Sequence, residues 1–241
     1  MKFSIITVTR NNLAGLEKTR ERLDAQTCRR FEWIIIDGDS TDGTAALLPN
    51  LQATILSEPD HGIYDAMNKG LVRAHGQYLL FLNAGDCLAA PETLERLLPY
   101  CDGSDFVYGD ALEGEHYKTA RSHHKILLGM FTHHQSMLYR REVLGSLHYD
   151  TTYRIAADYK FTSQFLRNAD QILYAPFPIC NFEQGGISQT AAQDGRMEQF
   201  CVREELKSCH GYVNAALYLA QTAQMGLRRT APGVYWAIKR G

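Results

Sequence analysis

The chain has 241 residues and a net charge of −2, because its 27 Asp and Glu side chains nearly balance its 25 Lys and Arg. This length fits one large α/β domain with an appended segment, and the charge balance gives no reason to expect a nucleic-acid partner. The six cysteines form no C-x-x-C pair and no run of 18 apolar residues occurs, so we expect a cytoplasmic protein without a zinc ribbon, disulfide framework, signal peptide or membrane span.

Predicted strands and helices alternate over the first 110 residues. Apolar runs predict strands over residues 3–8, 32–37, 53–56, 78–82 and 105–110. Capping residues or helical spacing predict helices that start after Asn12, run through 44–48 and 63–74, and start again at Pro91. This alternation favours a mostly parallel central sheet with helices on both faces.

The pattern is less regular beyond residue 115. We expect a strand at 136–139, a helix from 155 to about 167, two strands at 171–175 and 179–182, and a tight loop at 185–188. From residue 191 the composition becomes helical. The chain therefore divides into a sheet-based domain, residues 1–190, and a helical tail, residues 191–241.

Three carboxylates stand at the ends of predicted elements. Asp37 and Asp86 follow apolar strands, and Asp158 lies in the first turn of a helix. In an open α/β sheet the carboxyl ends of the strands border the ligand crevice, so acids placed there can contact a nucleoside or hold a divalent cation. Turn formation or helix capping is the alternative for each of them.

Other kinds of site are poorly supported. The pairs His123-His124 and His133-His134 are adjacent residues that do not share a face, and no Cys lies at ligand spacing, which disfavours zinc. No Ser or Cys stands in a G-x-S-x-G turn, and no G-x-G-x-x-G motif follows the first strand. Phosphate groups must therefore be bound in another way.

An ordered set of motifs resembles the inverting family-2 glycosyltransferases of the GT-A-type fold. It is most similar to the bacterial enzymes of exopolysaccharide, colanic acid or O-antigen synthesis. The matching segments are residues 4–11, 35–44, 62–70, 81–86, 134–136, 153–159 and 185–188. Each segment is weak by itself, but the order is specific, and it implies that residues 1–190 form the catalytic domain.

The resemblance also implies roles for individual residues. Asp158 would be the catalytic base, and Asp86 would bind a Mn²⁺ or Mg²⁺ ion on the donor diphosphate. The implied nucleotide-sugar contacts are Thr9, Arg10, Asp37, Asp65, Asn68, Asn83 and Gly85, with His134 on the acceptor side. Two departures from the family pattern stand out: Gly38 replaces a second acid, and the D-x-D motif is reduced to residues 83–86.

The expected reaction is transfer of a sugar from a nucleotide-diphosphate sugar, with UDP-sugar as the donor class, to a hydroxyl group of a glycan or lipid-linked acceptor. Two alternatives stay open. One is a catalytically inactive scaffold that binds nucleotide sugars, which the reduced metal motif favours. The other is a sugar-1-phosphate nucleotidyltransferase, although residues 9–12 lack the Gly-rich phosphate loop that such enzymes use.

The tail suggests a membrane contact. Its apolar helical stretches lead to Arg228, Arg229, Lys239 and Arg240. A basic amphipathic segment can lie on an anionic bilayer, which would place the protein at the inner face of the cytoplasmic membrane. A helix packed on the core with a solvated basic end is the alternative.

Overall fold

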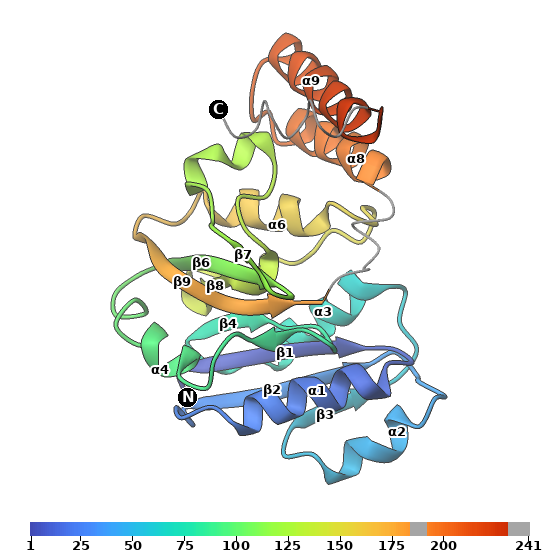
Figure 1. Ribbon diagram of the computed structural model, residues 1–241, viewed down its shortest axis with the longest axis vertical. Coiled ribbons are helices and arrows are strands. Elements are labelled where there is room, and N and C mark those ends of the chain that lie inside the picture. Colours follow the sequence, from blue (N-terminus) through green and yellow to red (C-terminus); the bar gives the residue numbers. More distant parts are fainter. Residues whose placement is uncertain (184–191, 231–241) are drawn as a thin grey trace.

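The computed structural model describes residues 1–183 and 192–230. Its centre is a nine-stranded sheet with the order β3-β2-β1-β4-β8-β6-β9-β5, with β7 paired to β6 (Figure 1). The strands are β1 (Phe3–Thr9), β2 (Phe31–Asp37), β3 (Thr54–Ser57), β4 (Tyr78–Phe81), β5 (Cys87–Leu88), β6 (Phe106–Glu113), β7 (His116–Lys118), β8 (Met137–Arg140) and β9 (Ile172–Phe182). The predicted α/β class is confirmed.

The first half of the sheet is parallel, and the second half is mixed. Strands β3, β2, β1 and β4 pair in parallel, and the register places Thr9 beside Asp37 at the carboxyl ends of β1 and β2. Beyond β4, strand β8 runs antiparallel to both β4 and β6, whereas β6 and β9 are parallel. The expected parallel arrangement therefore describes the half in which strands and helices alternate.

Helices cover both faces of the sheet because successive strand residues point to opposite sides. Ile35 packs in the apolar layer under α1 (Leu13–Asp24) and α4 (Thr93–Leu97). Its neighbours Ile34 and Ile36 pack in the opposite layer with α3 (Ile63–Arg73) and α6 (Ala157–Phe165). The shorter elements are α2 (Thr44–Leu47), α5 (Arg141–Leu144) and the 3₁₀ turns η1 (Leu48–Asn50), η2 (His123–Leu128) and η3 (His134–Ser136).

One predicted pair of strands is a single strand in the structure. Residues 172–182 form β9 without interruption, although Pro176 and Pro178 lie in its middle. A register shift opposite Gly109 and Asp110 accommodates them as a bulge. Prolines are tolerated in strands at such bulges. The prolines that predicted a break between two strands therefore indicate a bulge within one strand. The expected loop at 185–188 lies outside the described residues.

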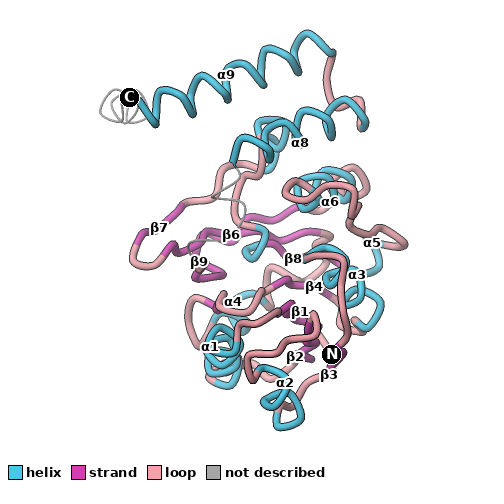
Figure 2. Tube along the Cα trace, turned by 90° about the vertical axis from the view of Figure 1, so that its right-hand side faces the viewer, coloured by secondary structure: helices cyan, strands magenta, loops and turns pink. Residues whose placement is uncertain are grey.

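Two helices follow the sheet domain. Helix α8 (Ala192–Glu205) packs on α6, where Val202 meets Ala156 and Tyr159, and α9 (Gly211–Thr230) lies on the far side of α8 from the sheet (Figures 1 and 2). The expected boundary at residue 190 falls in the undescribed segment. Among the described helices, none combines the length and apolar character needed to cross a bilayer.

Candidate active site

Two polar atoms at the carboxyl edge of the sheet have no partner. Thr9 ends β1 and Asn83 follows β4, and the chain order of the strands reverses between β1 and β4. Thr9 Oγ1 and Asn83 Oδ1 are buried and have no hydrogen-bond partner among the described residues. Because buried polar atoms are nearly always paired, these two atoms are candidates for hydrogen bonds with a ligand at this edge of the sheet.

Asp37 supports this edge from inside. Its side chain is fully buried, and its carboxylate accepts hydrogen bonds from the hydroxyl of Ser40, the backbone N–H of Ser40 at 3.2 Å and Ser57 Oγ at 2.7 Å. Ser40 Oγ in turn accepts from the backbone N–H of Asn11 at 2.7 Å. Asp37 therefore joins the loops that follow β1 and β2, and it leaves no free carboxylate surface for direct contact.

A different carboxylate faces the loop after β2. A Cβ atom at Gly38 would collide with Asp60 Oδ2 and would approach Arg10 Cδ to 3.2 Å. Asp60 is partly exposed, and its other oxygen accepts from the backbone N–H of Gly62 at 2.9 Å. Asp60, which follows β3, thus fills the space that a side chain at position 38 would occupy. The sequence signal for Asp60 was available, since it is another acid that follows a predicted strand.

The loop after β4 shows the same arrangement. Gly85 adopts a φ of +102°, and a Cβ atom there would collide with the carboxylate of Glu183. Asp86 is 3% exposed, and its two oxygens accept from Gln135 Nε2 and the backbone N–H of Glu183, each at 2.9 Å. Burial raises the pKa of Asp86 to about 6. Glu183 follows β9 and lies against this loop. Its carboxylate is half exposed and pairs with Lys18 Nζ at 3.5 Å.

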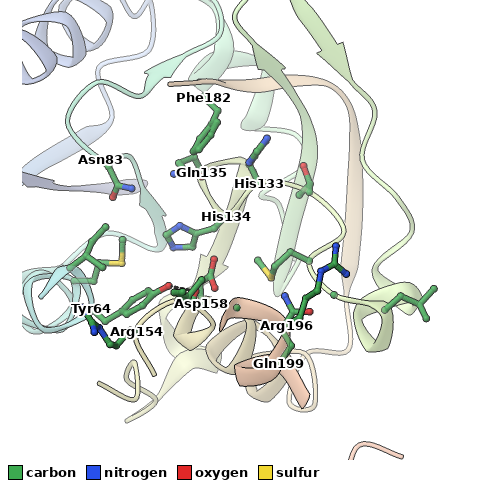
Figure 3. A pocket seen from close by; sticks show the side chains of 18 of the residues that line it. Tyr64, Asn83, His133, His134, Gln135, Arg154, Asp158, Phe182, Arg196 and Gln199 are labelled. Carbon is green, nitrogen blue, oxygen red and sulfur yellow. Dashed lines mark hydrogen bonds between the residues drawn. The ribbon is translucent and has the colours of Figure 1, made fainter. Parts of the chain in front are cut away.

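A cavity of about 550 Å³ opens beside these loops (Figure 3). Asn83 borders it from the sheet and Tyr64 from α3, while Arg196 and Gln199 reach it from α8. Asp158 lies near its centre with the carboxyl group pointing into the cavity. The cavity therefore joins the parallel half of the sheet to the C-terminal helices.

Asp158 is the one Asp or Glu among the described residues that line this cavity. Its Oδ1 accepts from the backbone N–H of Tyr159 at 2.7 Å, and burial raises its pKa to about 6. The hydroxyl of Tyr64 lies close by and donates to the carbonyl oxygen of Ile155 at 2.6 Å. Burial and the charge of Asp158 raise the pKa of Tyr64 well above its usual value, so Tyr64 keeps its proton.

His134 lies in the cavity wall as a neutral ring. It is 6% exposed, its ring stacks on Phe81 at 5.0 Å, and its Nε2 pairs with the hydroxyl of Tyr149 at 2.8 Å. Burial lowers the pKa of His134 to about 3. The imidazole therefore shapes the wall without charge at neutral pH.

Asp65 and Asn68 lie outside this cavity. Asp65 Oδ2 accepts from the backbone N–H of His61 at 3.1 Å and pairs with Lys69 at 3.4 Å. Asn68 makes two hydrogen bonds to the backbone of Tyr149, at 2.8 and 2.9 Å. Both residues stabilise the outer side of α3, whereas the positions directly before them on that helix, Tyr64 and Met67, line the cavity.

Comparison with known families decides the relationship. The model described as "Glycosyl transferase family 2" matches residues 4–160, more than half of the chain. The chain belongs to glycosyl transferase family 2. The predicted family is thus confirmed, and the protein is a nucleotide-sugar glycosyltransferase by membership.

Individual relatives agree with this family. A PGL/p-HBAD biosynthesis glycosyltransferase of Mycobacterium bovis is 34% identical over 203 residues, which cover 78% of this chain and 79% of the relative. The S. aureus TarS fragment 1–349, solved in complex with UDP, has a TM-score of 0.72 and 20% identity over 95% of this chain and 74% of that chain. The Pyrobaculum calidifontis mannosyltransferase PcManGT, solved with GDP-Man and Mn²⁺, has a TM-score of 0.68 and 16% identity over 99% and 78% of the two chains. These two likenesses support the GT-A-like fold.

Several residues that shape this candidate site were missed by sequence reasoning. Gln135 lies inside a recognised motif, but its bond to Asp86 spans 49 positions. Glu183 and Glu198 act on segments 97 and more than 40 positions away, respectively. Contacts of this kind leave no local pattern, so only the fold shows them.

Proposed function

We propose that this family-2 protein is an inverting glycosyltransferase. It transfers a sugar from a UDP-sugar to a hydroxyl group of a glycan or lipid-linked acceptor in bacterial surface polysaccharide synthesis. The observation that carries the proposal is that Asp158 provides the single carboxylate among the described residues that line the cavity, which also reaches Asn83 at the donor edge. An inverting displacement needs one general base on the acceptor side and no carboxylate nucleophile, and the cavity lining offers this composition.

Asp158 acts on the acceptor hydroxyl. Its carboxylate takes the proton as the hydroxyl oxygen attacks the anomeric carbon, and the nucleoside diphosphate leaves on the opposite side. A base with a pKa of about 6 is largely ionised at neutral pH and is a stronger base than an ordinary Asp. Tyr64 keeps its proton and donates it to the carbonyl oxygen of Ile155, so its hydroxyl oxygen can accept a hydrogen bond from the acceptor.

The donor lies along the carboxyl ends of β1, β2 and β4. Thr9 Oγ1 and Asn83 Oδ1 are free to bond to it, and Arg10 is exposed beside them. Asp60 presents a carboxylate, which accepts hydrogen bonds from N–H groups. This suits a uracil ring, because the N3–H of uracil is a hydrogen-bond donor. TarS has been solved with UDP and with UDP-GlcNAc, which supports a UDP-sugar as the donor class.

A divalent cation, Mn²⁺ or Mg²⁺, fits the loop after β4. Among the described residues no group of three His, Cys, Asp or Glu side chains could hold a metal ion. Such ions need few protein oxygens when a diphosphate and water supply the rest. Asn83 Oδ1 and the half-exposed carboxylate of Glu183 offer two, and the backbone N–H of Glu183 donates a hydrogen bond to Asp86. The bound ion would neutralise charge on the leaving diphosphate.

Helix α9 reaches the cavity from the side of the C-terminal helices. Gln221 of α9 lines the cavity, and Tyr212 and Leu219 of α9 expose 75% and 66% of their surface. We propose that α9 and the basic residues after it contact an anionic membrane from the cytoplasmic side, where a lipid-linked acceptor would be found. Flotation with anionic vesicles tests this contact: equal recovery of the full chain and of a chain ending at residue 210 would refute it.

Donor binding and turnover test the proposed reaction together. Thermal unfolding is measured with UDP-, GDP- and dTDP-sugars, with and without Mn²⁺ or Mg²⁺. Release of the nucleoside diphosphate is followed in parallel. A UDP-sugar at 100 times its Kd should add about 2.7 kcal/mol to the free energy of unfolding. Binding without release of UDP by any acceptor extract would favour the inactive scaffold, and formation of pyrophosphate from UTP would favour the nucleotidyltransferase.

The cation site has its own test. Glu183→Gln is expected to weaken the Mn²⁺-dependent part of the UDP-induced thermal shift, while the shift given by UDP without metal stays unchanged. Asn83→Ala removes a donor contact as well, so it should weaken both parts of the shift. Glu92→Gln, an exposed acid on the surface near α4, is the matched control. An unchanged metal response in both variants would remove this loop as the cation site.

A further inference from the structure

A carboxylate from the C-terminal helices holds the segment that leads to Asp158. Glu198 of α8 accepts hydrogen bonds from three consecutive backbone N–H groups: Arg154 at 3.0 Å, Ile155 at 2.8 Å and Ala156 at 2.8 Å. These contacts join positions 42 to 44 residues apart. Helix α6 begins directly after them, at Ala157, and Asp158 is its second residue.

The segment needs such a partner because its own side chains provide none. The residue before α6 is Ala156, which makes no side-chain capping bond. The first N–H groups of a helix and of the turn before it have no partners within the helix, and leaving them unpaired is costly. A carboxylate that accepts several of them forms charge-assisted hydrogen bonds, which are stronger than neutral ones. Glu198 therefore accepts from the N–H of the N-cap residue, as the Glu of a capping box does, and also from the two N–H groups before it.

The same segment is held from the other side by α3. Tyr64 donates its hydroxyl proton to the carbonyl oxygen of Ile155 at 2.6 Å. Ile155 is thus fixed at its N–H by Glu198 and at its C=O by Tyr64, and both Ile155 and Tyr64 line the cavity. The backbone from 154 to 156 has two anchors, one in each half of the molecule.

We propose that Glu198 is a positioning residue for sugar transfer: by anchoring residues 154–156 it sets the place of the Asp158 carboxylate in the cavity. This inference rests on the proposed role of Asp158 as the base. It makes α8 part of the catalytic unit. Small errors in the placement of a catalytic group are costly, since a shift of about 1 Å can lower the rate by about 100-fold.

Glu205 provides a matched control on the same helix. Its carboxylate pairs with Lys160 of α6 at 2.5 Å and accepts from the hydroxyl of Tyr153 at 2.8 Å. Glu205 therefore also attaches α8 to α6 and the loop before it, but it makes no bond to the backbone of residues 154–156. A general loosening of α8 should follow from either substitution, whereas loss of the anchor should follow only from a change at Glu198.

The test compares Glu198→Ala and Glu198→Gln with Glu205→Ala in the full chain, using a UDP-sugar donor. Glu198→Ala is expected to lower kcat by about 10- to 100-fold with the donor Kd within about threefold of the wild type. Glu198→Gln keeps the size of the side chain and one acceptor oxygen, so it should recover part of the rate and also serves if the Ala variant does not fold. Glu205→Ala should keep kcat within about twofold. Equal kcat losses at positions 198 and 205, or none at 198, would overturn the proposal.

Amide hydrogen exchange gives a readout that does not depend on turnover. In Glu198→Ala the amides of residues 154–158 should exchange faster than in the wild type, and in Glu205→Ala they should not. If the wild type shows no transfer with any donor, the proposed function fails while the exchange result still decides whether Glu198 is the anchor. Unchanged exchange at 154–158 in Glu198→Ala would refute the anchor itself.

Discussion

The two edges of the cavity are held together by different kinds of contact. At the donor edge, formed by the carboxyl ends of β1, β2 and β4, Asp37 bonds to Ser40 three positions later and to Ser57 on the neighbouring strand. At the acceptor edge, formed by residues 154–156, α6 and α8, Tyr64 and Glu198 bond to a segment 91 and 43 positions away, respectively. At β1 and β2 the donor edge is therefore built from contacts between residues 3 to 29 positions apart, whereas the acceptor edge exists only when distant helices have docked.

This difference suggests a division of tasks. All members of a family that use one class of donor can keep the same short motifs after their strands. The acceptor edge can change with the C-terminal helices without disturbing the parallel sheet. If so, substitutions at the two edges should separate into effects on donor affinity and effects on transfer.

The largest expected effect lies at the acceptor edge. Asp158→Asn should lower the rate of transfer by about 10²- to 10⁴-fold, because it removes the base that accepts the hydroxyl proton. The Kd for UDP should stay near that of the wild type, since the donor edge is intact. Steady-state release of UDP and a titration with UDP measure the two quantities. Asp170→Asn, an exposed acid beyond the end of α6, is the control and should keep full activity; a similar rate for both variants would exclude Asp158 as the base.

At the donor edge, Asp60→Asn should weaken the binding of UDP by about 10- to 100-fold. A hydrogen bond to a charged group contributes about 1.5–3 kcal/mol, and each 1.4 kcal/mol is a tenfold change in Kd. Asp65→Asn is the informative comparison, because the sequence motif suggested Asp65 whereas the structure places its carboxylate against His61 and Lys69. Calorimetric titration with UDP decides between them, and a larger loss at Asp65 would support the sequence motif.

Much of the donor edge could be predicted, and the physical reason is local. Apolar runs place strands, and the acids that follow them must stand at one edge of a parallel sheet, which predicts Asp37 and Asp86 there. Thr9 and Asn83 were added only by the resemblance to the family. The state of Asp86 could not be predicted, because its burial depends on Gln135 and Glu183, which approach it from 49 and 97 positions away. The continuous β9 was missed for a similar reason, since its bulge depends on the pairing with β6.

The acceptor edge should also show a pH dependence. Burial raises the pKa of Asp158 to about 6, and the base must be ionised to act. The value of kcat/KM should therefore fall as the pH drops below 6, by about tenfold per unit. Stability should change in the opposite direction: a folded-state pKa above the unfolded value of about 3.9 means that ionisation between pH 4 and 6 destabilises the fold. A pH–rate profile without a limb near pH 6 would contradict this assignment.

The smallest expected effect concerns the attachment of α8. Lys160, whose amine is nearly buried, pairs with Asp150 and Glu205, each at 2.5 Å, and these partners raise the pKa of Lys160 against the opposing effect of its burial. Glu205 is half exposed and Asp150 stays in place, so Glu205→Gln should lower the free energy of unfolding by less than about 1 kcal/mol at pH 7.

The sign of the pH dependence follows from the pKa of Glu205, which its bond with Lys160 lowers. The stability that this group contributes is complete above its unfolded pKa of about 4.3 and is lost as the pH falls through the lower folded value. Urea unfolding of both proteins should therefore show a small difference at pH 7 that shrinks as the pH falls below about 4.3. A loss of several kcal/mol at pH 7 would mean that α8 is held by this one ion pair, and the acceptor edge would then depend on far fewer contacts than the bonds of Glu198 and the packing of Val202 indicate.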